Sequence, residues 1–162
     1  MSELRLEVIG KEITEELTAI SRRLSAPSAL MTGISVELLS LTELALEREG
    51  YPDKWPTLAL STIRGREKKG HWPGKMLQIS AAGLAASIQP FASGNQAGIS
   101  SSKPYSAIQQ FGGQAGRGKK VAIPARPYMP MRLRGSDMEL TPEASTSILE
   151  LARDFLSGSL TD

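Results

Sequence analysis

A glycine-rich basic segment comes nearest to a known catalytic motif. Residues 113–119 read Gly-Gln-Ala-Gly-Arg-Gly-Lys and satisfy the first seven positions of a phosphate-binding P-loop. The eighth position is Lys120, which has no hydroxyl group to ligate magnesium. No parallel-type strand is predicted before the loop, and Pro124 and Pro127 exclude the helix that has to follow a P-loop. We therefore expect a basic loop and not a nucleotide-hydrolysing site.

Other catalytic chemistry finds little support in the sequence. His71 is the only histidine, and the chain has no cysteine, whereas a structural zinc ion needs about four such ligands. Residues 51–135 contain no acid other than Asp53 and Glu67 that could orient a histidine base in a nucleophilic triad. We predict no catalytic residue, no metal, no cofactor and no enzymatic activity.

The charged residues are strongly segregated along the chain. Residues 1–50 hold five Lys or Arg and nine Asp or Glu, residues 51–135 hold thirteen and two, and residues 136–162 hold one and six. A basic centre with a net charge of +11 thus lies between ends with net charges of −4 and −5. This pattern fits a surface that faces nucleic acid, or subunit contacts in which acidic helices of one copy meet basic loops of the next.

The basic centre contains two clusters that suit contact with backbone phosphates, because their lysines and arginines lie in glycine-containing loops. We predict that they face either a DNA channel or a neighbouring subunit. Arg126, between Ala125 and Pro127, is expected to form hydrogen bonds at an interface instead. The candidate residues of the two clusters are Arg64, Arg66, Lys68, Lys69, Arg117, Lys119 and Lys120.

Two long helices are predicted to form an N-terminal helical hairpin over residues 1–50. Apolar residues repeat at steps of three and four from Leu6 to Leu24, which indicates an amphipathic helix that packs on the core or on a neighbouring subunit. Pro27 breaks this helix and begins a more deeply buried one that ends before Gly50. No apolar run is expected to approach the ~18 residues that span a bilayer, so we predict no membrane contact.

Residues 51–135 are predicted to form a basic loop and an antiparallel sheet core. The segment 51–74 has little periodicity and reads as a long loop anchored by Trp55 and Trp72. Segments 76–79, 83–91 and 97–101 read as antiparallel strands, although 84–87 also suits a helical turn.

A short helix over 105–111 is predicted to place Phe111 in the core and to end at Gly112 with a positive φ angle. Three prolines in residues 124–130 remove backbone donors, so this segment is expected to lie extended at an edge or between subunits. The candidate interface residues are Tyr105, Phe111, Gly112, Gly113, Pro124, Arg126, Pro127 and Tyr128.

The C-terminal part, residues 136–162, is predicted to be a helix. Thr141 and Pro142 supply an N-cap and a first-turn proline, Glu143 suits the helix dipole, and Gly158 closes the helix. With 162 residues and 40% apolar content, the chain is expected to form one domain of the α+β class.

The segment Tyr105-Ser-Ala-Ile-Gln-Gln-Phe-Gly-Gly113, followed by Ile123-Pro-Ala-Arg-Pro-Tyr128, resembles the virion-morphogenesis (tail-completion) family of tailed bacteriophages, Mu-like phages included. Upstream segments 53–58, 62–63, 75–77 and 83–88 follow in the family's order. Gln109 stands where the family usually has His, and Ala82 where it usually has Thr, at positions that carry no chemistry in the family.

The resemblance implies a structural virion protein that completes the tail or joins it to the head. By analogy with related neck and tail-joining proteins, a six- or twelve-fold ring around the DNA channel is expected. Its partners would be head-connector and tail-tube or tail-terminator proteins, with non-specific contact to packaged DNA. Its place would be the neck of a virion assembled in the cytoplasm of the bacterial host. The alternative is a non-enzymatic nucleic-acid-binding accessory factor that acts in head assembly through the same basic centre.

Overall fold

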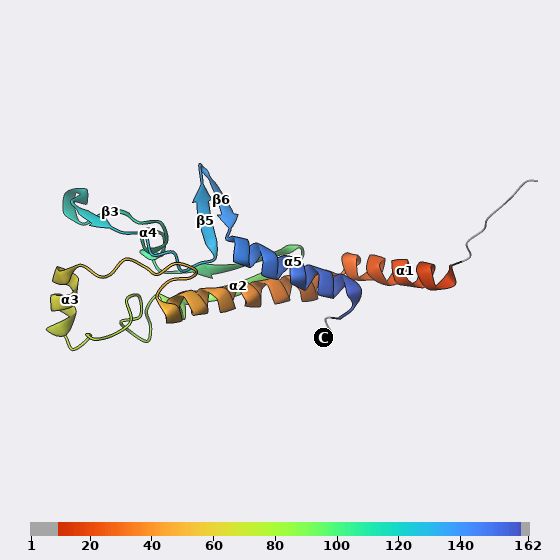
Figure 1. Cartoon of the computed structure of the whole chain (residues 1–162), viewed down its shortest axis with the longest axis horizontal. Helices are drawn as coiled ribbons and strands as arrows, with labels where there is room; N and C mark the ends of the chain where they lie inside the picture. Colours follow the sequence, from red (N-terminus) through yellow and green to blue (C-terminus); the bar gives the residue numbers. More distant parts are fainter. Residues whose placement is uncertain (1–9, 160–162) are drawn as a thin grey trace, which may run out of the picture.

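The computed structural model describes residues 10–159 and confirms the α+β class (Figure 1). The helices are α1 (Lys11–Ser25), α2 (Ser28–Arg48), α3 (Leu60–Glu67), α4 (Ser106–Phe111) and α5 (Pro142–Ser157), with short 3-10 turns η1 (Ala85–Ser87) and η2 (Arg117–Lys119). The strands are β1 (Ile88–Ser93), β2 (Gln96–Ser101), β3 (Gly113–Ala115), β4 (Val121–Ile123), β5 (Met131–Arg134) and β6 (Asp137–Leu140).

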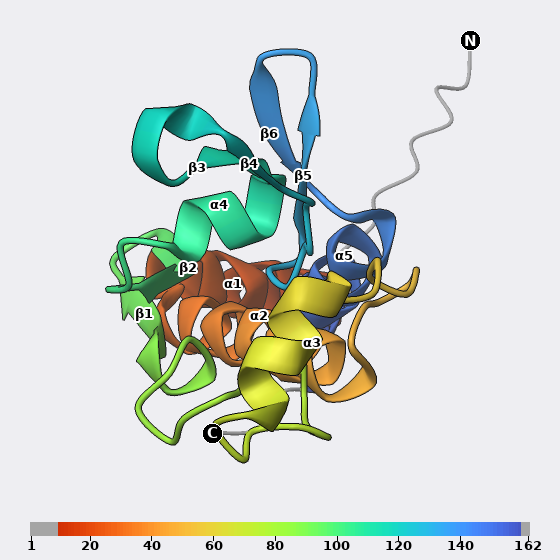
Figure 2. The same ribbon diagram turned by 90° about the vertical axis from the view of Figure 1, so that its left-hand side faces the viewer.

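The first two helices do not fold back on each other, so the predicted helical hairpin is wrong. α1 and α2 lie end to end along the long axis of the molecule (Figure 1), and the view along that axis shows one behind the other (Figure 2). α2 packs against β1, β2 and α5, whereas the contacts of α1 with the body are made to α5. Leu6 and Ile9, part of the predicted stripe, lie outside the described residues.

Helix α2 is the core helix of the domain. Leu38, Thr42, Ala45 and Leu46 on its inner side are buried. By length and composition the 21-residue helix α2 also passes as a membrane span, with a mean hydropathy of 1.5 over an 18-residue window, which the sequence-based expectation overlooked. Its packing between the β1–β2 hairpin and α5 accounts for this apolar character, since core helices of globular domains share it.

The main hydrophobic cluster lies at the C-terminal end of α2. Ala45 and Leu46 meet Trp55, Leu84 and Ile88 there. Tyr128 from the proline-rich segment completes the cluster and is only 1% exposed. The segment that was expected at an edge or between subunits therefore passes through the centre of the domain.

Part of the predicted loop 51–74 is the helix α3, and residues 76–79 do not form the predicted strand. The two segments are linked by the buried side chain of Arg66 on α3. Its Nη2 donates to the Met76 carbonyl at 2.6 Å, while the Met76 N–H donates to Glu49 Oε1 at 2.7 Å. The backbone of Met76 is thus committed to side chains and cannot pair with a strand.

The strands form three separate two-stranded antiparallel hairpins instead of one small sheet. The predicted β1–β2 hairpin turns at 93–96 and packs on α2, and the alternative helical turn at 84–87 is confirmed as η1. β3–β4 and β5–β6 project from the body (Figure 1). The predicted caps of α5 are confirmed: Thr141 Oγ1 accepts from the Ala144 N–H, and Gly158 closes the helix at a φ of 79°.

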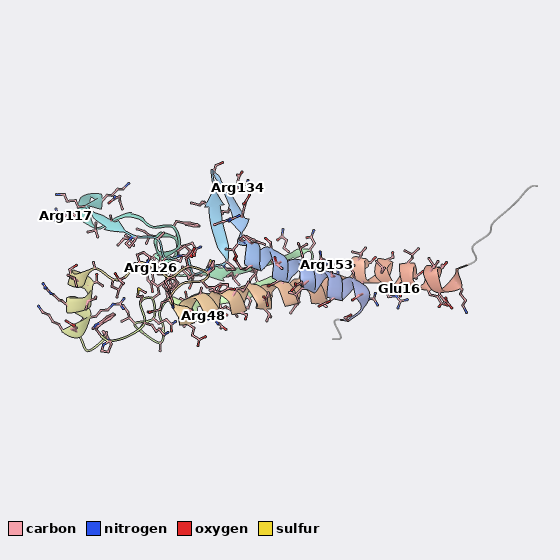
Figure 3. All side chains as sticks on the ribbon, viewed as in Figure 1. Glu16, Arg48, Arg117, Arg126, Arg134 and Arg153 are labelled. Carbon is pink, nitrogen blue, oxygen red and sulfur yellow. The ribbon has the colours of Figure 1, made fainter. Side chains whose placement is uncertain are left out.

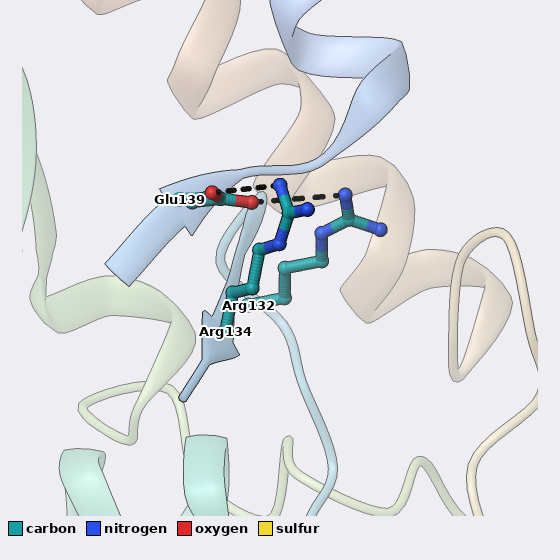
Figure 4. A network of polar contacts seen from close by, with 3 residues as sticks. All are labelled: Arg132, Arg134 and Glu139. Atoms are coloured by element: carbon teal, nitrogen blue, oxygen red, sulfur yellow. Dashed lines mark hydrogen bonds and ion pairs between the residues drawn. The ribbon is translucent and has the colours of Figure 1, made fainter. Parts of the chain in front are cut away.

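The β5–β6 hairpin was not predicted. Glu139 lies between two arginines of the partner strand, with Oε2 3.8 Å from Arg132 Nη2 and Oε1 3.3 Å from Arg134 Nη1 (Figure 4). The two arginine side chains are largely exposed and Glu139 is partly exposed, so these ion pairs contribute at most about 1 kcal/mol of stability. They do reduce the positive charge of this hairpin.

Candidate assembly surface

The side chain of Gln110 fastens the proline-rich segment to α4. Its Oε1 accepts from the N–H groups of Tyr128 and Met129, both at 2.9 Å. Its Nε2 donates to the carbonyls of Met129 and Met131, both at 3.1 Å. Gln110 is 3% exposed, so one buried amide satisfies four backbone groups that the prolines leave without strand partners.

Arg126 and Trp55 fasten the same segment to residues 55–57. Arg126 Nε donates to the Pro56 carbonyl at 3.2 Å and its Nη2 to the Thr57 carbonyl at 3.1 Å. Trp55 Nε1 donates to the Pro127 carbonyl at 2.8 Å. Burial lowers the pKa of Arg126, and the positive charge of Arg66 lowers it further. Arg126 thus forms hydrogen bonds as predicted, but within its own chain.

Arg66 is another buried side chain that donates to backbone carbonyls. Its Nη1 donates to the Lys75 carbonyl at 3.1 Å, next to the bond to Met76. Burial lowers its pKa, and the nearby carboxylate of Glu49 opposes this shift. Arg66 is 9% exposed and therefore is not part of the exposed basic surface that the sequence predicted.

Gly112 forms the sharp turn from α4 into β3. Its φ of 71° confirms the predicted positive angle, although its ψ of −176° places it outside the left-handed helical region. A Cβ atom there would lie 2.8 Å from the Ala125 nitrogen and 2.9 Å from the Ile123 oxygen. Only glycine suits this backbone conformation and this close approach.

A groove of about 820 Å³ lies between α3 and the β3–β4 hairpin. Residues 57–62 line one wall, 121–124 line the other, and Met76, Leu77 and Leu84 lie at its base. Large apolar side chains stay exposed at its mouth, among them Leu60 at 71% and Val121 at 52%. Surfaces of this kind commonly bind another apolar segment.

Exposed cations flank this groove on both sides. Arg64, Lys68 and Lys69 are exposed on and just after α3, and Arg117, Lys119 and Lys120 are exposed at the tip of the β3–β4 hairpin. Both elements lie at the same end of the elongated molecule, with Arg117 at its extreme (Figures 1 and 3). The two clusters, separate in sequence, therefore form one basic end, which we call the groove end.

The candidate interface residues divide into four groups. Tyr105 and Pro124 line the groove. Phe111 and Pro127 line a second cavity of about 520 Å³ on the other side of the proline-rich segment. Phe111 is 36% exposed and not in the core as predicted, because α4 turns the amide of Gln110 inward instead. Gly112 and Gly113 shape the entry to β3, while Arg126 and Tyr128 are buried.

Sequence reasoning did not single out Gln110, the most connected residue of the site. The available signal was the row of backbone groups that three nearby prolines leave without strand partners. Next to it, Gln109 Oε1 is buried and finds no donor among the described residues. Burial raises the pKa of Tyr128, whose hydroxyl donates to the Ser106 carbonyl at 3.3 Å.

Within residues 10–159, no group of three or more His, Cys, Asp or Glu side chains could hold a metal ion. His71 is exposed, and β3 follows α4 directly, which differs from the strand-to-helix context of a P-loop.

Two known phage-related proteins are similar in sequence to this chain over most of its length. The chain is 33% identical over 146 residues to the Mu-like prophage FluMu G protein 2 of Haemophilus influenzae, an alignment that covers 90% of each chain. It is 35% identical over 119 residues to the putative capsid assembly protein G of Escherichia phage Mu, covering 71% of this chain and 73% of that one. No solved structure shows significant similarity. Because residues 8–157 match the phage virion morphogenesis family, the chain belongs to that family.

Proposed function

We propose that this morphogenesis protein is a structural component of the virion that completes the tail or joins it to the head. It does so by assembling into a ring of identical copies around the DNA channel, at the neck of the particle. Its neighbours there are head-connector and tail-tube or tail-terminator proteins. The ring has six or twelve copies.

One observation carries this proposal: both ends of the elongated molecule expose apolar side chains, on α1 at one end and around the groove at the other. The groove end is basic and apolar, and the other end is the protruding helix α1 (Figure 1). A monomeric protein rarely keeps a large contiguous apolar patch exposed without a partner. Surfaces at opposite ends of one chain favour head-to-tail association, which forms a ring where the rotation closes.

A second candidate function rests on the six exposed cations of the groove end. They would bind DNA phosphates without reading sequence, as an accessory factor in head assembly does. The name of the phage Mu relative, a putative capsid assembly protein, also points to the head. This candidate predicts a monomer or dimer that binds free DNA.

Particles from a phage that lacks this chain would separate the two functions. The neck proposal predicts filled heads and tails that stay apart or leak DNA, and that join when the purified chain is added. The accessory-factor candidate predicts empty or malformed heads that later addition does not repair. Normal infectious particles without the chain would overturn both.

A charge reversal of Arg117, Lys119 and Lys120 to Glu tests what the cations contact. If they face DNA in the lumen, rings should assemble while particles retain DNA poorly, because each lost cation weakens phosphate contact. If they face a neighbouring copy, the ring should not form even at low salt. Electron microscopy of mutant particles distinguishes these outcomes.

A further inference from the structure

The apolar stripe of α1 is not covered by the chain that carries it. Ile13, Leu17 and Leu24 are 58%, 61% and 62% exposed, and α1 contributes no buried residue. Contact with the body comes late in the helix, where Arg23 Nη1 donates to the Leu156 carbonyl at 2.6 Å. The first turns of α1 project beyond α5 (Figure 1). Since isolated helices of this length are marginal in water, the stripe needs a partner surface.

One flank of this stripe is acidic. Glu12 and Glu16 are spaced four residues apart and therefore share a face of the helix, next to the row of Ile13 and Leu17. Glu16 lies at the end of the molecule opposite to Arg117 (Figure 3). The arm, defined here as α1, thus offers an apolar stripe with carboxylates beside it.

The groove end offers the complementary surface. Its walls expose Leu60, Ile79 and Val121, which are 71%, 50% and 52% exposed, and its rim carries the six cations described above. The apolar area of the groove matches an apolar stripe, and its cations match carboxylates that flank such a stripe. The arm cannot reach the groove of its own chain, because the two lie at opposite ends (Figures 1 and 3).

We propose that α1 of one copy docks in the groove between α3 and the β3–β4 hairpin of the next copy. This inference rests on the proposed assembly of identical chains and specifies its contact. Leu17 enters the groove opposite Leu60, and Glu12 and Glu16 lie toward the basic rim. The contact uses two different surfaces, so each copy both gives an arm and receives one, and the series closes as a ring.

A mixing experiment with two variants tests this contact. Leu17→Asp removes the arm's apolar centre, and Leu60→Asp places an acid at the groove mouth. Both residues are exposed, so neither change should impair folding, which circular dichroism would verify. Each variant alone should be monomeric by native mass spectrometry at concentrations where wild type is a ring, since loss of a central apolar contact weakens binding about tenfold or more.

The decisive result is the mixture of the two variants. Leu17→Asp keeps an intact groove and Leu60→Asp keeps an intact arm, so the 1:1 mixture should form a heterodimer and nothing larger. Leu149→Asp is the matched control, because Leu149 is 56% exposed on α5, away from both surfaces. This variant should form the wild-type ring.

Three outcomes would overturn the docking contact. Arms that pair with each other would make Leu17→Asp monomeric while Leu60→Asp still oligomerises. If the ring uses other surfaces, both variants would still form it. That outcome would contradict the docking contact but not the proposed function. A wild type that stays monomeric would exclude the contact, while the particle experiments above judge the role in the neck separately. Rescue of Glu12→Lys/Glu16→Lys by Lys68→Glu/Lys69→Glu would support the charge pairing, and its failure would contradict that pairing.

Discussion

The proline-rich centre and the groove end of the molecule both contain cations, but those of the centre are buried and those of the groove end are exposed. At the centre, the cations Arg66 and Arg126 are buried and donate to backbone carbonyls. At the groove end, Arg117 and Lys120 are exposed at a hairpin tip. A buried cation or amide that is fully hydrogen-bonded specifies one backbone path, whereas an exposed cation remains available to a partner. The buried cations of the centre therefore stabilise one fold, and the exposed cations of the groove end remain available for the proposed assembly.

This contrast explains why a segment with three prolines can lie in the core. Prolines 124, 127 and 130 exclude strand pairing, so side chains have to supply the missing partners. Gln110 and Trp55 do so from outside the segment, and Arg126 within it donates to the carbonyls of Pro56 and Thr57. The result is a rigid base from which the β3–β4 hairpin projects.

The largest effect on stability is expected at Gln110. Gln110→Ala would leave the buried N–H groups of Tyr128 and Met129 without acceptors, which should lower the free energy of unfolding by about 3 kcal/mol. Gln109→Ala is the matched control, because the Oε1 it removes has no partner among the described residues, and it should cost less than about 0.5 kcal/mol. Urea denaturation measures both. Equal costs would contradict the fastening role of Gln110.

A smaller loss is expected at the turn before the hairpin. Gly112→Val should lower the free energy of unfolding by about 2 kcal/mol, because its Cβ would meet the backbone of Ala125 and Ile123 at a positive φ. Gly135→Val shares the positive φ, at 64°, but has open space around it and should cost only about 1 kcal/mol. If both variants melt at the wild-type temperature, the close approach at Gly112 is wrong.

The two classes of arginine should differ in a matched pair of substitutions. Arg126→Met keeps most of the packing but removes donors from the Pro56 and Thr57 carbonyls, so it should cost about 1.5 kcal/mol. Arg117→Met at the exposed tip should leave stability unchanged within about 0.5 kcal/mol. Both free energies come from the same denaturation series. If Arg117→Met lowered the free energy of unfolding as much as Arg126→Met, the buried and exposed arginines would not differ in their contribution to stability.

The smallest effect concerns alkaline pH. Because burial raises the pKa of Tyr128, the neutral phenol is favoured in the folded state. The contribution of Tyr128 to the free energy of unfolding is complete below the pKa of the unfolded state, about 10, and is lost as pH rises through the higher pKa of the folded state. Tyr128→Phe should therefore cost less than about 1 kcal/mol at pH 7 and should lose less stability than wild type between pH 9 and about 11. Parallel pH profiles would show that Tyr128 does not titrate with unfolding.

Local patterns predicted the elements whose signals are complete within a few residues. The Thr141 cap, the Gly158 end of α5 and the positive φ of Gly112 belong to this class. The direction of α1 was not predictable, because it depends on which faces of α2 the β1–β2 hairpin and α5 occupy. These are tertiary contacts without a local signature.

The candidate site was predicted in outline and not in detail. Charge counting drew attention to the basic centre, but it could not separate buried Arg66 from exposed Arg64 two residues earlier. That separation depends on carbonyls of Lys75 and Met76, which a sequence pattern does not show as acceptors. Helix α3 was missed for the same reason, since its anchor is a tertiary hydrogen bond.

Thiol crosslinking of a double variant tests the central claim most directly, namely that the two ends of the molecule join identical copies. The chain has no cysteine, so every crosslink would report introduced residues alone. Ile13→Cys/Leu60→Cys, treated with a short thiol-to-thiol crosslinker, should give a ladder of covalent multimers that ends at the size of the ring. Neither single variant should crosslink, and Ile13→Cys/Leu149→Cys should give no ladder. Dimers from Ile13→Cys alone, or no multimers from the double variant under conditions where the ring forms, would contradict the claim.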